Sequence, residues 1–82
     1  MRAAVDISLY PLAGDYIPPI KAFIARLNSH AELTVVTNPL STQVRGELDR
    51  IMAILAEEMQ GAAVVGPQLV FVLKILPGLG SP

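Results

Sequence analysis

Polar side chains alternate along a short stretch near the middle of the chain, and their types suit the binding of a small polar molecule. Ser41, Gln43 and Arg45 are separated by Thr42 and Val44, which is the period of a β-strand whose two faces have different surroundings. One face is suited to a core. The other carries a hydroxyl, an amide and a guanidinium group in a row, and such a row needs water or a ligand.

A second polar row occurs in the first predicted strand, residues 3–10. Asp6, Ser8 and Tyr10 alternate there with apolar residues, so one face of the strand is predicted to be buried. A carboxylate is disfavoured in the middle of a strand. A solvated face or a cross-strand partner such as Arg45 would account for Asp6 structurally, and a bound ligand would account for it functionally.

The composition excludes several classes of function. The 82 residues form one small domain, and 52% of them are hydrophobic while 16% are charged, so we expect apolar surface to be buried by self-association. A net charge of -1 without a basic cluster argues against nucleic-acid binding. The chain has no cysteine, and its single histidine, His30, has no partner at metal-ligand spacing. We therefore predict no metal site and no cofactor.

The sequence predicts a cytoplasmic protein without membrane contact. A charged residue, Asp6, follows the start too soon for the apolar segment of a signal peptide. The apolar run 69–75 is interrupted by Lys74 and is too short to span a bilayer.

Two helices are predicted to position the strands. Pro18-Pro19 marks the start of the first, because proline is tolerated in the first helical turn, and Asn28-Ser29-His30 closes it. His30 lies where a cation favours a helix C-terminus. The second helix begins at Gly46–Asp49 with an acidic first turn, and Gly46 needs either a positive φ or close backbone approach.

The second helix is predicted to end near Met59, before a loop at Gln60–Pro67 in which residues 62–65 could add some order. Its apolar stripe is Leu48, Ile51, Met52, Leu55 and Met59, and its exposed side carries Asp49, Arg50, Glu57 and Glu58. We interpret the neighbouring Glu57 and Glu58 as a solvated face.

The remaining strands are predicted at 31–37, 41–46 and 68–76, with a turn at Asn38-Pro39. The order β-α-β-β-α-β predicts an α+β, ferredoxin-like sandwich with a four-stranded antiparallel sheet and two helices on one face. Residues 1–76 form the domain and 77–82 a loose tail. In this topology the first and third strands are central, so the two polar rows meet, and the outward residues of the last strand, Val70, Val72 and Leu76, give them an apolar border.

Three segments carry a resemblance to a known family: Asp6–Leu12, Leu40–Gly46 and the apolar last strand. They resemble the YkoF-like family, which binds thiamine or hydroxymethylpyrimidine. The resemblance implies a ferredoxin-like domain that works in pairs and binds its ligand without transforming it, with no catalytic residue. A single copy in this chain implies a homodimer or homotetramer. The segment Leu76–Gly80 departs from the family pattern, which has a polar continuation there.

The residues predicted to bind the thiamine-type ligand are Asp6, Ser8, Tyr10, Thr37, Ser41, Thr42 and Gln43. Hydroxyl, amide and carboxylate groups can satisfy an aminopyrimidine, an aromatic ring such as that of Tyr10 can pack on it, and Asp6 would favour a thiazolium cation. Two other hypotheses stay open. The first is an oligomerising interaction or regulatory domain without a ligand. The second is an enzyme, for which no nucleophile–base pair can be named.

Overall fold

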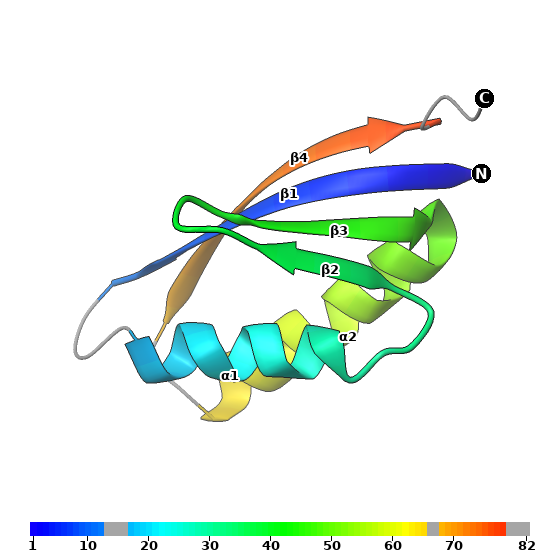
Figure 1. Ribbon diagram of the computed structural model, residues 1–82. Helices are drawn as coiled ribbons and strands as arrows, with labels where there is room; N and C mark the ends of the chain where they lie inside the picture. Colours follow the sequence, from blue (N-terminus) through cyan, green and yellow to red (C-terminus); the bar gives the residue numbers. More distant parts are fainter. Residues whose placement is uncertain (13–16, 66–67, 79–82) are drawn as a thin grey trace.

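The computed structural model describes residues 1–12, 17–65 and 68–78, and within these it forms four strands and two helices (Figure 1). The elements are β1 (Arg2–Pro11), α1 (Ile17–Asn28), β2 (Thr34–Thr37), β3 (Thr42–Glu47), α2 (Leu48–Val65) and β4 (Leu69–Pro77). No helix in these ranges is long and apolar enough to cross a membrane.

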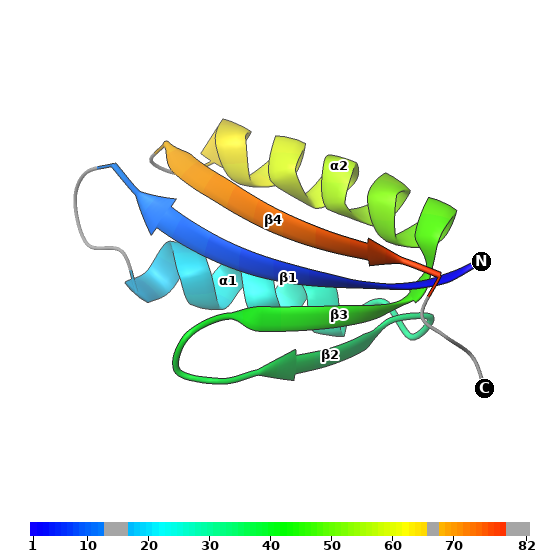
Figure 2. The ribbon, with the colours of Figure 1, turned by 90° about the horizontal axis from the view of Figure 1, so that it is seen from above.

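The four strands form one antiparallel sheet in the order β2-β3-β1-β4. Both helices lie on one side of it, and Figure 2 views the sheet from the other side, which we call the open face. The predicted ferredoxin-like α+β fold is therefore confirmed. β1 and β3 are the two central strands, as expected, and β4 lies beside β1.

The strand register decides which side chains share a face. Ile7 is opposite Thr42 and Val5 is opposite Val44, and all four side chains are buried toward the helices. Asp6 is opposite Gln43 on one side and Lys74 on the other. Because successive residues of a strand alternate between faces, this row of three lies on the open face.

The core fills the layer between sheet and helices. Its apolar residues are Ala3, Val5, Ile7, Phe23, Leu27, Leu33, Val44, Ile51, Ile54 and Leu55. The ring of Phe23 on α1 lies 5.0 Å from that of Phe71 on β4, measured between centroids, at an angle of 57°. This tilted aromatic pair joins a helix to the edge of the sheet.

The second helix differs from its prediction in length and in phase. It continues to Val65, so the loop predicted from Gln60 is wrong for residues 60–65; residues 66–67 lie outside the described part. Gly61 is tolerated inside the helix because Met59 and Ala62 pack against the core. The stripe is also rotated, since Ile54 is buried while Met52 is 39% exposed.

The hairpin between β2 and β3 is shorter than expected but turns as predicted. β2 begins at Thr34 and β3 at Thr42. The backbone N–H groups of Leu40 and Ser41 donate to Oδ1 of Asn38 at 2.8 and 3.0 Å. An asparagine side chain that closes the chain on itself in this way is common in turns.

Candidate functional site

A hydrogen bond joins the two polar rows at the centre of the open face. The hydroxyl of Ser41 donates to Oδ1 of Asp6 at 2.7 Å, which leaves Oδ2 for another donor. The predicted alternative partner, Arg45, lies opposite Ala4, and among the described residues Asp6 forms no ion pair with it. Asp6 is thus held by a hydroxyl, beside Gln43 and Lys74.

The seven predicted site residues divide between the two sides of the sheet. Asp6, Ser8, Tyr10 and Gln43 lie on the open face, with Ser41 bonded to Asp6. Thr37 and Thr42 lie on the helix side instead, because both share a cross-strand row with the buried Ile7. Their hydroxyls share a hydrogen bond of 3.0 Å.

A shallow hollow of about 300 Å³ lies on the open face over the first half of β1 and the end of β4, and of the predicted site residues it is lined by Asp6 and Gln43. Its lining residues are Ala4, Val5, Asp6, Gln43, Arg45, Lys74, Ile75 and Leu76. Leu76 in this lining is 57% exposed, and Val70 and Val72, farther along the same face of β4, are 41% and 45% exposed. The open face therefore combines a polar centre with an uncovered apolar border on β4.

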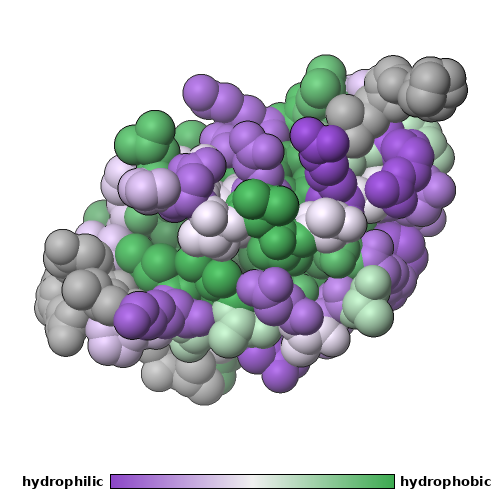
Figure 3. Space-filling model, viewed as in Figure 1, coloured by the Kyte–Doolittle hydropathy of each residue, from purple (hydrophilic) through white to green (hydrophobic). Residues whose placement is uncertain are grey.

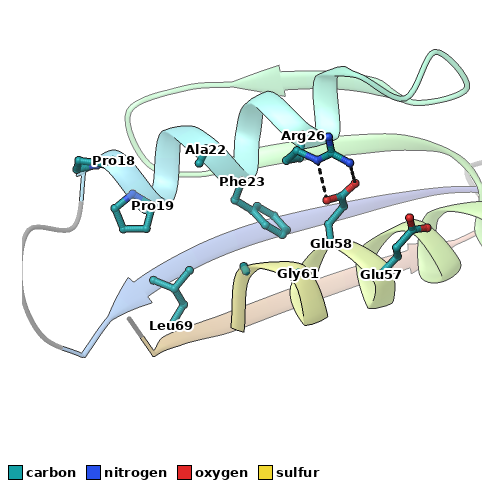
Figure 4. Close-up of a pocket in the computed structure, with 10 residues that line it drawn as sticks. Pro18, Pro19, Ala22, Phe23, Arg26, Glu57, Glu58, Gly61 and Leu69 are labelled. Carbon is teal, nitrogen blue, oxygen red and sulfur yellow. Dashed lines mark hydrogen bonds and ion pairs between the residues drawn. The ribbon is translucent and has the colours of Figure 1, made fainter. Parts of the chain in front are cut away.

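A buried carboxylate ties the two helices together. Glu58 of α2 is 6% exposed, and it accepts two hydrogen bonds from Arg26 of α1, at 3.1 and 3.3 Å (Figure 4). Nε2 of His30 lies 2.8 Å from Oε2 of Glu58. Hydrogen bonds from Arg26 and His30 hold the pKa of Glu58 below its usual range.

The prediction of a solvated Glu58 is therefore wrong. The buried side of α2 recurs at helical spacing, at Ile51, Leu55 and Ala62. Position 58 falls on the same face of the helix. That spacing is the sequence signal that could have identified Glu58. Glu57 is exposed, as predicted.

A larger groove lies between the helices, on the side of the sheet away from the open face. It has a volume of about 710 Å³ and ends at the Arg26–Glu58 pair (Figure 4). Its lining residues are Pro18, Pro19, Ala22, Phe23, Arg26, Glu57, Glu58, Gly61, Ala62 and Leu69. No ligand residue was predicted here from the sequence.

On the face shown in Figure 3, hydrophobic side chains gather over the middle of the molecule among polar ones.

The sequence matches the model of the family described as "YKOF-related Family" over residues 2–78. The chain belongs to this family. The resemblance read from the sequence motifs is therefore confirmed. A comparison with curated proteins finds no significant match.

Solved structures share the fold of this YKOF-related chain. A Streptococcus pneumoniae protein is 31% identical with a TM-score of 0.84, over 95% of this chain and 88% of its own. A Thermotoga maritima protein, assigned provisionally to thiamine biosynthesis or salvage, is 23% identical with a TM-score of 0.87, over 100% of this chain and 89% of its own. A hypothetical protein from Methanocaldococcus jannascii is 23% identical with a TM-score of 0.81, over 99% of this chain and 84% of its own.

Proposed function

We propose that this protein binds thiamine or its hydroxymethylpyrimidine moiety, without transforming it, on the open face of a homo-oligomer. Membership of the YKOF-related family supports the proposal, as does the provisional assignment of the Thermotoga maritima neighbour to thiamine biosynthesis or salvage. The observation that carries it is the hydrogen bond from Ser41 to Asp6, which orients a carboxylate at the centre of that face.

The chemistry of the open face suits the two halves of thiamine. The amide of Gln43, directly opposite Asp6, can both donate to and accept from an aminopyrimidine. The carboxylate of Asp6 favours a thiazolium cation nearby. Tyr10 is 57% exposed at the end of β1, where its ring can pack on a heteroaromatic ring. Thr37 and Thr42, on the helix side, have no part in this proposed site.

Self-association would complete the site. The exposed Val70 and Val72, and Leu76 beyond Lys74 on the same strand, leave apolar surface on the open face that a second copy could bury. A second copy that covers this border would also reduce the exposure of the ligand to water, which a shallow hollow of about 300 Å³ does not do alone.

We propose binding without catalysis because the open face offers a poor nucleophile–base pair. Ser41 is bonded to a carboxylate, which is a weak base, and the single histidine, His30, is bonded to Glu58 instead. The second candidate is an interaction domain without a ligand, and the exposed apolar border of β4 is the observation that favours it.

Isothermal titration with thiamine and with hydroxymethylpyrimidine separates the two candidates. We expect binding of at least one ligand, and we expect Ser41→Ala and Gln43→Ala to weaken it by about 1 kcal/mol each, the usual value of one lost hydrogen bond. Binding of neither ligand would favour the interaction domain. Gly61→Leu, which fills the groove between the helices, is the matched control. Loss of thiamine binding in this variant alone would contradict the open face as the site.

A further inference from the structure

Two cationic side chains on the open face have no carboxylate bonded to them within the described residues. Arg45 of β3 and Lys74 of β4 are exposed, and both line the shallow hollow of about 300 Å³. Neither takes part in the side-chain hydrogen bonds or ion pairs of the described ranges. Arg26 and Arg50, in contrast, each donate to both carboxylate oxygens of one glutamate. The positive charges of the hollow are therefore available to a ligand.

The carboxylate nearest to these cations is already bonded elsewhere. The register places Lys74 directly opposite Asp6, and it places Arg45 opposite Ala4, two residues along β1. β1 lies between β3 and β4 in the sheet (Figure 2). Asp6 accepts the hydroxyl of Ser41 at 2.7 Å and forms no ion pair with either cation. The lining of the hollow thus has two positive charges and one negative charge.

A small residue gives an anion room between the two cations. The row that crosses β1 at Ala4 has Arg45 on one side and Leu76 on the other. The methyl group of Ala4 is much shorter than either neighbour, so the surface is hollowed there. A guanidinium group can donate to two phosphate oxygens at once, and an ammonium group attracts phosphate as a point charge. The hollow therefore has the donor types that suit a phosphate group.

Self-association would increase the need for such an anion. A second copy on the open face would remove Arg45 and Lys74 from water, and a charge that is buried without a counter-charge is costly. A purely cationic ligand would leave this cost in place. A ligand with an anionic group would offset it.

We propose that the hollow binds the phosphate group of a phosphorylated thiamine-type ligand, with Arg45 and Lys74 on the phosphate and Asp6 on the cationic ring. This inference rests on the proposed function and narrows its ligand to the phosphate ester. A ligand with a cation at one end and an anion at the other matches a hollow that holds a carboxylate and two cations.

The phosphate group gives the first test. Thiamine, thiamine monophosphate, hydroxymethylpyrimidine and its monophosphate are each titrated calorimetrically into the protein. Each ester should bind at least about tenfold more tightly than its parent compound, because hydrogen bonds between charged groups are stronger than neutral ones. Added salt should reduce this advantage.

The outcomes of these titrations separate the two proposals. Thiamine that binds as tightly as its ester, or more tightly, would overturn the phosphate site and leave the proposed function standing. Binding of none of the four compounds would overturn the proposed function, and the phosphate site with it.

Variants give the second test. Arg45→Gln and Lys74→Gln should each lower the affinity for thiamine monophosphate about tenfold without weakening the binding of thiamine itself. Lys21→Gln removes the same charge from an exposed position on α1, on the other side of the sheet, and should change neither affinity. Circular dichroism and sedimentation confirm that each variant keeps its fold and its assembly. An undiminished ester advantage in both open-face variants, or equal losses for thiamine and its ester, would overturn the inference.

Discussion

Ser41 and Asp6 stand 35 positions apart in the sequence, and the hydroxyl of Ser41 donates a 2.7 Å hydrogen bond to the carboxylate of Asp6. This bond joins the two segments, Asp6–Leu12 and Leu40–Gly46, that carry the family resemblance. The adjacency of β1 and β3 in the sheet makes the contact. A loss of either partner should therefore change the open face without reaching the core.

The buried carboxylate of Glu58 should contribute to stability, and its neighbour Glu57 should not. We expect Glu58→Gln to destabilise the fold by roughly 1–3 kcal/mol, because charged hydrogen bonds are lost at a buried position. Glu57→Gln changes the same chemistry one residue away on an exposed side chain and should have little effect. Urea unfolding of the two variants measures the difference, and equal midpoints would show that the Arg26–Glu58 pair does not stabilise the helices.

The same carboxylate predicts a loss of stability in acid. The folded-state pKa of Glu58 lies below its ordinary value of 4.5, so its contribution is fully present above that value and is lost as pH falls through the lowered pKa. A hydrogen bond from Arg50 also lowers the pKa of the exposed Glu32. Protonation of Glu32 in acid therefore changes stability in the same direction. Melting temperatures should fall below about pH 4.5 in the wild type and less steeply in Glu58→Gln. Parallel slopes for the two proteins would contradict this assignment.

Gly46 should tolerate a bulky residue poorly. A Cβ at this position would lie 3.3 Å from the carbonyl oxygen of Glu32 and 3.3 Å from Cδ2 of Leu33. The sequence predicted either close backbone approach or a positive φ at this glycine. The structure shows close approach, and the φ of Gly46 is not positive. Gly46→Val should destabilise by about 1–3 kcal/mol through overpacking, whereas Arg50→Ala on an exposed ion pair should change the melting temperature little. Equal melting temperatures would argue against this tight junction.

Gly61→Ala should raise stability. The added methyl group meets nothing within 4 Å, and alanine in a helix interior is favoured over glycine by about 0.5–1 kcal/mol. A rise of several degrees in melting temperature is expected for a domain of this size. A fall would indicate that the C-terminal part of α2 is not helical in solution, as the sequence prediction of a loop from Gln60 had suggested.

The sequence predicted the element order, the central strands and the polar rows because strand alternation is a local signal. The prediction was wrong at residues whose environment depends on a contact that the local sequence does not reveal. Glu58 carries a charge, so it was assigned to solvent, although its helical spacing places it with Leu55. Gly61 resembles a helix end, but the packing of Ala62 extends the helix past it. Thr42 alternates with Ser41 and Gln43, so its side chain lies on the buried face of the strand. Its hydroxyl forms a hydrogen bond there with the hydroxyl of Thr37.

The apolar border on β4 should make the protein associate with itself. Val70, Val72 and Leu76 are exposed on one strand, and their burial by a second copy would remove apolar surface from water. Sedimentation velocity at micromolar concentration should show a dimer or a tetramer, and Val72→Lys should shift the distribution toward monomer. A monomer in the wild type would contradict the proposed homo-oligomer.

The response of Asp6→Asn to two ligands tests the central proposal most directly. This substitution keeps the shape of the side chain and removes its charge, so calorimetric titration should show a larger loss of affinity for cationic thiamine than for neutral hydroxymethylpyrimidine. The wild-type titrations with both ligands provide the reference. An equal loss for both ligands, or no loss for either, would contradict the account in which Asp6 faces the thiazolium ring on the open face.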